Sequence, residues 1–147
     1  MLRIRPHHIL DIVRNIGNKR PLTPHEYGHL VHTVTEMIIR DPNVMCELVV
    51  SNDDICTPCR MLNTEGQCED MLAQLEEPVS KQEYNDELDR RLLALLSIEQ
   101  GTIMTLSDYL SLVIDNFDAV VSICTHPKED RESRRVGLRN GIETLLH

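Results

Sequence analysis

Three cysteines, Cys56, Cys59 and Cys68, lie within thirteen residues near the middle of the chain. A CxxC turn directs two sulfur atoms at a common point, and thiolates grouped in this way bind zinc or iron–sulfur clusters. The run Asn63–Gly66 between them is typical of a turn. The sequence therefore predicts a cysteine loop over residues 52–68 that holds a metal centre. A redox dithiol and inert thiols are the alternative interpretations.

Three local thiolates leave one position of a tetrahedral centre open, so the fold must supply another ligand. Cys124 is the predicted fourth ligand, and a buried core thiol is the alternative interpretation of that residue. Cys46 lies in a predicted strand and is expected in the core. His7 and His8 begin the first predicted helix, with Asp11 one turn later. These three are candidate neighbours of the site, although the histidines alone would also suit the capping of a first turn.

The charge balance narrows the classes of partner. A formal net charge of -9 over 147 residues opposes binding to nucleic acids or anionic membranes. No stretch has the length of a membrane span, and the N-terminal residues lack an apolar signal core. We therefore expect a cytoplasmic protein whose partner is another protein or a small molecule. In that compartment a CxxC pair is more often metal-binding or catalytic than a structural disulfide.

Hydrophobic periodicity predicts a mainly α fold of the α+β class, built as a single compact domain over residues 1–147. About six helices are expected, with one small β element near residues 44–50 that pairs with Leu2–Arg5. The first helix follows Arg5 and ends at Gly17. The other predicted helices cover residues 24–40, 69–75, 80–95, 105–117 and 118–124 and the segment after Pro127.

Residues 25–29 spell a second motif, HExxH, in which zinc peptidases use two histidines as ligands and the glutamate as general base. At about 100° per residue, the apolar side chains of Leu30, Val34 and Ile38 fall on the opposite face of the predicted helix. The histidines line up instead with Glu36, on the face expected to be solvated. A peptidase would bury that face in a cleft, so a zinc-dependent hydrolase is the least favoured function.

Two stretches, Arg5–Leu10 and Asp53–Cys56, together resemble a family of small uncharacterised bacterial and archaeal proteins with an RPHHLLC signature. That family is a domain of unknown function with suspected iron–sulfur binding, and the resemblance covers roughly the first half of the chain. It implies that His7 and His8 belong to the functional region with the three loop cysteines. Asp11 stands where the signature ends in cysteine. Either Asp11 is an oxygen ligand, or Cys124 completes the set, or this member has lost the cluster.

The hypothesis from the sequence is a metal-binding or iron–sulfur-cluster-binding protein that carries a cluster, senses one or transfers electrons. The resemblance favours an iron–sulfur cluster over zinc, since one CxxC pair does not distinguish the two. The alternatives are a structural zinc-binding interaction protein and a thiol–disulfide redox protein that uses the CxxC pair. Whether the protein is an enzyme is left open by the sequence.

Overall fold

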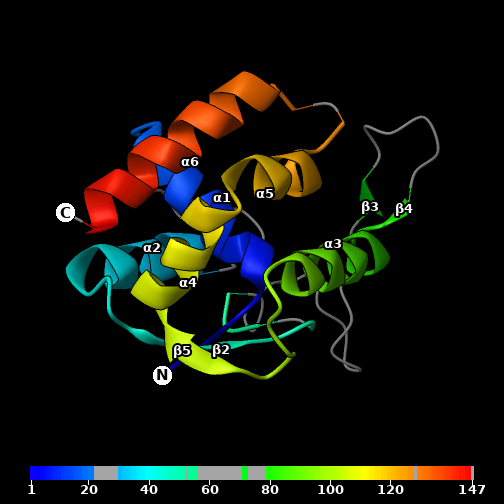
Figure 1. Ribbon diagram of the computed structural model, residues 1–147, viewed down its shortest axis with the longest axis horizontal. Coiled ribbons are helices and arrows are strands. Elements are labelled where there is room, and N and C mark those ends of the chain that lie inside the picture. Colours follow the sequence, from blue (N-terminus) through cyan, green and yellow to red (C-terminus); the bar gives the residue numbers. More distant parts are fainter. Residues whose placement is uncertain (22–29, 52, 56–70, 73–78, 128, 147) are drawn as a thin grey trace.

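The computed structural model describes residues 1–21, 30–51, 53–55, 71–72, 79–127 and 129–146 (Figure 1). Within them lie six helices and a small three-stranded mixed sheet, so the protein is mainly α with an α+β arrangement, as predicted. The helices are α1 (Pro6–Gly17), α2 (Val31–Arg40), α3 (Lys81–Leu95), α4 (Leu106–Asp115), α5 (Phe117–Cys124) and α6 (Arg131–Leu146). The strands are β1 (Leu2–Ile4), β2 (Met45–Leu48), β3 (Met71–Leu72), β4 (Val79–Ser80) and β5 (Ile103–Thr105).

The three-stranded sheet has the order β1-β2-β5. Strands β1 and β2 run parallel, with Leu2 opposite Cys46 and Ile4 opposite Leu48. This pairing confirms the prediction that residues 44–50 contain a strand beside the N-terminal segment. Strand β5 runs antiparallel to β2 and was not predicted, because three residues are too few for an alternating pattern to be recognised.

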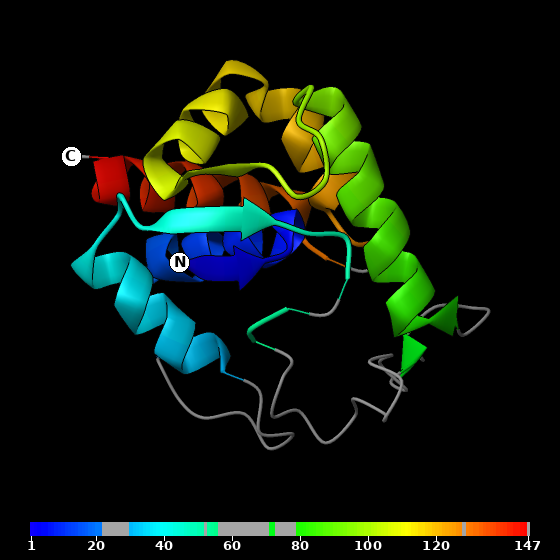
Figure 2. The ribbon, with the colours of Figure 1, turned by 90° about the horizontal axis from the view of Figure 1, so that it is seen from below.

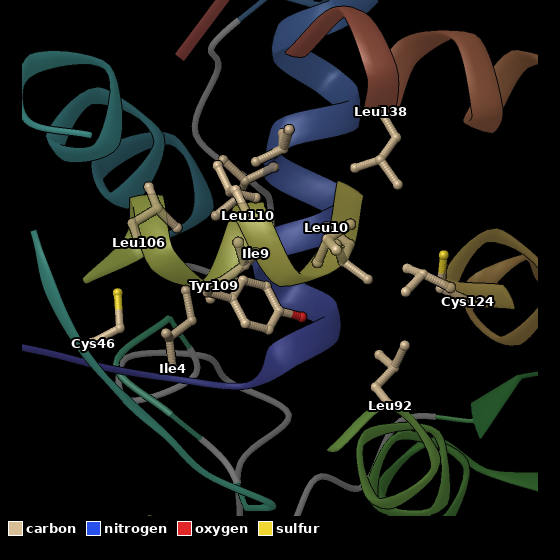
Figure 3. Packing of buried hydrophobic residues seen from close by; sticks show 14 of the residues in the cluster. Ile4, Ile9, Leu10, Cys46, Leu92, Leu106, Tyr109, Leu110, Cys124 and Leu138 are labelled. Carbon is tan, nitrogen blue, oxygen red and sulfur yellow. The ribbon is translucent and has the colours of Figure 1, made fainter. Parts of the chain in front are cut away.

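Helix α1 lies at the centre of the molecule, between the sheet and α6 (Figure 2). One strongly apolar stripe explains its position: Ile9, Leu10, Ile12 and Val13 are all at most 1% exposed. The ring of Tyr109, from α4, is surrounded by this core (Figure 3), and its hydroxyl donates a hydrogen bond to the carbonyl of Pro6 at 3.1 Å. The first turn of α1 is therefore held firmly in place.

Two predicted helix starts are confirmed by their capping bonds. The Ser80 hydroxyl accepts a hydrogen bond from the amide of Glu83 at 3.5 Å, and that of Thr105 accepts one from the amide of Asp108 at 3.1 Å. Among the described helices, none is long and apolar enough to span a membrane.

The helix expected over 69–75 is wrong, because residues 71–72 form β3 and pair antiparallel with β4. A short apolar run does not by its periodicity separate a strand from a helix, and here the pairing partner decided. The predicted helix start at residue 24 lies outside the described residues, where the structure gives α2 from Val31.

Candidate metal centre

The candidate site lies at the carboxyl edge of the parallel strands β1 and β2. Strand β1 leads into the segment Arg5–His8 that begins α1, and β2 leads into residues 49–55. The amide of Asp54 donates to the carbonyl of Arg3 at 3.0 Å, and the Asp54 carboxylate accepts from the amide of Arg3 at 2.8 Å. Because neighbouring parallel strands end at the same edge, two segments about 45 residues apart in sequence lie side by side.

Asp53 joins these two segments. Its Oδ2 accepts hydrogen bonds from the ring Nδ1 of His8 at 2.7 Å and from the amide of Arg5 at 2.8 Å. Burial acts to raise the pKa of Asp53, but the charge and hydrogen bond of His8 and the amide of Arg5 outweigh it and lower the pKa to about 2. Burial lowers the pKa of His8, and the facing Asp53 carboxylate more than offsets this, so the pKa is raised.

A second carboxylate, Asp89 of α3, holds His7. Its Oδ1 accepts hydrogen bonds from both the ring Nδ1 and the amide of His7, each at 2.9 Å, and its Oδ2 accepts one from the Arg5 guanidinium at 2.8 Å. Asp86 accepts a further bond from Arg5 at 2.7 Å. Burial acts to raise the pKa of Asp89, but His7 and Arg5 lower it, so the buried carboxylate is ionised.

The two histidines thus form side-by-side pairs with ionised carboxylates. Their ring centroids are 4.5 Å apart. In each ring the carboxylate holds Nδ1, which makes Nε2 the nitrogen available to a ligand. A carboxylate behind one nitrogen is the usual support of a metal-binding histidine. Across the part of the chain that the structure describes, however, no three histidine, cysteine or carboxylate side chains are arranged to hold a metal.

Asp11 and Cys124, the two alternatives for the remaining ligand, both contact the guanidinium of Arg134. Arg134 of α6 donates through Nη2 to Asp11 at 2.7 Å, through Nη1 to the Sγ of Cys124 at 3.5 Å, and through Nε to Glu129 at 2.7 Å. Burial raises the pKa of the Cys124 thiol to about 11 despite the nearby Arg134 charge. Without a metal, Cys124 is a protonated thiol in contact with a cation.

The other cysteines and histidines considered in the sequence either lie outside the described residues or belong to the core. Cys56, Cys59 and Cys68 lie outside the described residues, as do the histidines and the glutamate of the HExxH motif. Cys46 is completely buried in the core, as expected, and burial raises its pKa to about 11.

Sequence reasoning missed three charged side chains that organise this region, namely Arg5, Asp89 and Arg134. One of them carried a usable signal: Asp89 falls on the apolar face of its helix, beside Leu92 and Leu93. A charged residue in such a stripe usually has a buried partner, which here is Arg5.

The model of a protein family of unknown function, DUF1284, covers residues 25–128. The chain belongs to this family. The DUF1284 match includes the cysteine loop, Asp53 and Asp89, and it begins after the segment that carries His7 and His8. No curated protein matches the chain, and no solved structure matches it.

Proposed function

We propose that this DUF1284 protein binds a metal centre through Cys56, Cys59 and Cys68 and serves as a cluster carrier, a cluster sensor or an electron-transfer module. An iron–sulfur cluster is the preferred group, because the RPHHLLC resemblance implies one, and zinc is the alternative. The cysteines supply soft thiolate ligands, and the described part of the fold supplies the histidine pair.

The observation that carries this proposal is the pair of carboxylate-held histidines. Residues 53–55, which fix His8 through Asp53, lead directly in the sequence to Cys56. Ile55 is anchored, since it is 2% exposed and its carbonyl accepts a hydrogen bond from the amide of Leu30 at 2.9 Å. The first cysteine of the loop therefore follows an ordered segment that also touches the histidine site.

This arrangement favours His7 or His8 over Cys124 as the ligand that completes the centre. Each histidine has a carboxylate that can accept a hydrogen bond from its Nδ1–H group while Nε2 binds a metal. Cys124 instead contacts the guanidinium of Arg134, and that positive charge opposes the approach of a metal cation. Asp11 is engaged by the same guanidinium at 2.7 Å.

Metal analysis of anaerobically purified protein tests the proposal. We expect iron and acid-labile sulfide in comparable amounts and a brown colour from thiolate-to-iron charge transfer. The Cys56→Ser variant should lose the centre, whereas Cys46→Ser, which alters a core cysteine, should keep it. Stoichiometric zinc in a colourless sample would show that the bound metal is zinc and not an iron–sulfur cluster. Protein free of both metals, or full loading of Cys56→Ser, would contradict the proposal.

A second comparison identifies the completing ligand. His7→Ala and His8→Ala should be examined singly for metal content beside Cys124→Ser, with circular dichroism to confirm that each variant is folded. We expect the metal content to fall in at least one histidine variant and to be unchanged in Cys124→Ser. The reverse result would assign the position to Cys124.

A further inference from the structure

A cavity of about 270 Å³ lies between α3 and α5, which pack side by side (Figure 1). This size approaches the lower end of the range for small-molecule sites. Among the described residues, its lining does not include the histidine pair. The residues that line it are Glu83, Tyr84, Glu87, Leu88, Arg91 and Ile123.

Along the rim of this α3–α5 groove, two negative side chains are followed by a positive one. Glu83, Glu87 and Arg91 are exposed and occupy successive turns of α3. Residues four apart on a helix are separated by about 6 Å along its axis, and residues eight apart by about 12 Å. Glu87 lies 3.8 Å from Arg90 in a pair with both side chains mostly exposed, which is too weak to remove Glu87 from other contacts.

The floor of the groove is apolar. Leu88 is 8% exposed, and the side chains of Tyr84 and Ile123 are half-buried. The ring of Tyr84 is supported from one side by His126, with 5.8 Å between the ring centroids. A ligand that fits this groove needs an apolar body, with a cationic group toward the glutamates and an anionic group toward Arg91.

We propose that the α3–α5 groove binds a short zwitterionic peptide, two or three residues long, with an apolar side chain. The amino terminus of a dipeptide pairs with Glu87 and that of a tripeptide with Glu83, the carboxylate pairs with Arg91, and the apolar side chain covers Leu88 and Ile123. An extended chain of two or three residues spans about 7 to 11 Å, which matches the separation of the charges along α3. This binding does not depend on the proposed metal centre.

The dipeptide glycyl-leucine and its two blocked forms test this proposal. Backbone amide signals in a ¹H–¹⁵N NMR titration should shift in α3 and α5 and saturate, with a dissociation constant in the high micromolar to millimolar range, as is usual for a ligand of this size. N-acetylation removes the amine and amidation removes the carboxylate. Each block should weaken binding about two- to fivefold, the effect of one exposed ion pair.

Two variants assign the charges. Glu87→Gln should weaken the free dipeptide but not the N-acetyl form, and Arg91→Gln should weaken the free dipeptide but not the amide. Glu99→Gln, which changes an exposed glutamate outside the groove, is the control and should leave all three affinities unchanged. Absence of a saturable shift up to about 10 mM would overturn the site. Equal affinity of the three forms in the wild type would overturn the zwitterionic ligand.

Discussion

Buried charges join the N-terminal segment to the rest of the molecule at the scale of single residues. Arg5 is completely buried and is neutralised by Asp89 and Asp86, both from α3. Such a network is costly to desolvate, and breaking it by removing one partner costs more than the network contributes as a whole. The side chain of Asp89 is 0% exposed and that of Asp86 is 21% exposed. Because both contact the same guanidinium, substituting each in turn compares a buried partner with a more exposed one.

Asp89→Asn should destabilise the fold by about 3–5 kcal/mol, because it leaves the Arg5 guanidinium buried beside a neutral amide and removes the anion that holds His7. Asp86→Asn changes the more exposed partner of the same guanidinium and should cost about 1 kcal/mol. Urea unfolding of the two variants measures both values. Equal, small losses would show that the charge of Asp89 is not needed to neutralise Arg5.

Asp11 makes stability depend on pH. Burial alone would raise its pKa, but Arg134, His7 and Arg14 lower it from 3.8 to about 2 in the folded state. A depressed pKa contributes stability above the unfolded value, near pH 4, and this contribution is lost as the pH falls toward 2. Because the Asp11 side chain is 36% exposed, solvent screening reduces it to about 1 kcal/mol.

Wild type and Asp11→Asn should therefore differ in unfolding free energy at pH 6 and converge near pH 2. Denaturant unfolding at several pH values across this range measures the difference. A difference that stayed constant down to pH 2 would contradict the assignment of the titration to Asp11.

The contact between α1 and α6 is decisive at the scale of elements. These helices cross closely because glycines line the contact, Gly17 on α1 and Gly137 and Gly141 on α6. A Cβ atom at Gly141 would overlap the backbone carbonyl of Val13, which a small rotation of a side chain does not relieve. The position of α6, and with it that of Arg134, depends on this close approach.

Gly141→Ala should destabilise the protein by roughly 2–3 kcal/mol or more, because overpacking forces the two helices apart. Asn140→Ala changes the exposed neighbour on the same helix and should alter stability by less than about 0.5 kcal/mol. Thermal unfolding compares the two variants. Since alanine favours a helix by about 1 kcal/mol over glycine, a stabilised Gly141→Ala would show that the helices can separate without cost.

At the scale of the whole molecule, the proposed metal centre would join the cysteine loop to the edge of the sheet. Ligand binding to the folded state alone raises stability, and metal ligation by thiolates couples to folding in this way. Removing the metal anaerobically with a chelator should therefore lower the Tm of the loaded protein. The Tm of Cys56→Ser should not respond to the chelator. An unchanged Tm after verified loss of metal would show that the centre does not stabilise the fold.

Local sequence signals were sufficient to predict where helices α1, α3 and α4 begin. A capping residue or an N-terminal proline, together with an apolar stripe, acts within a few residues. These signals were sufficient as well for the strand at 45–48 and its partner at the N-terminus. They failed for β5 and for β3, where two or three residues form a strand only because another strand lies beside them.

The sequence by itself determined the mainly α class and the candidate donors, since residue type and spacing carry that information. Only the tertiary structure decided how the donors are grouped. In the folded chain His8 is hydrogen-bonded to Asp53 and His7 to Asp89, and Arg134 contacts both Asp11 and Cys124. Three of these pairs join residues that are 45 to 123 positions apart, and Arg134 and Cys124 are 10 apart. Electrostatic pairing in the interior depends on where the packed helices bring charges together, which no local pattern in the chain reveals.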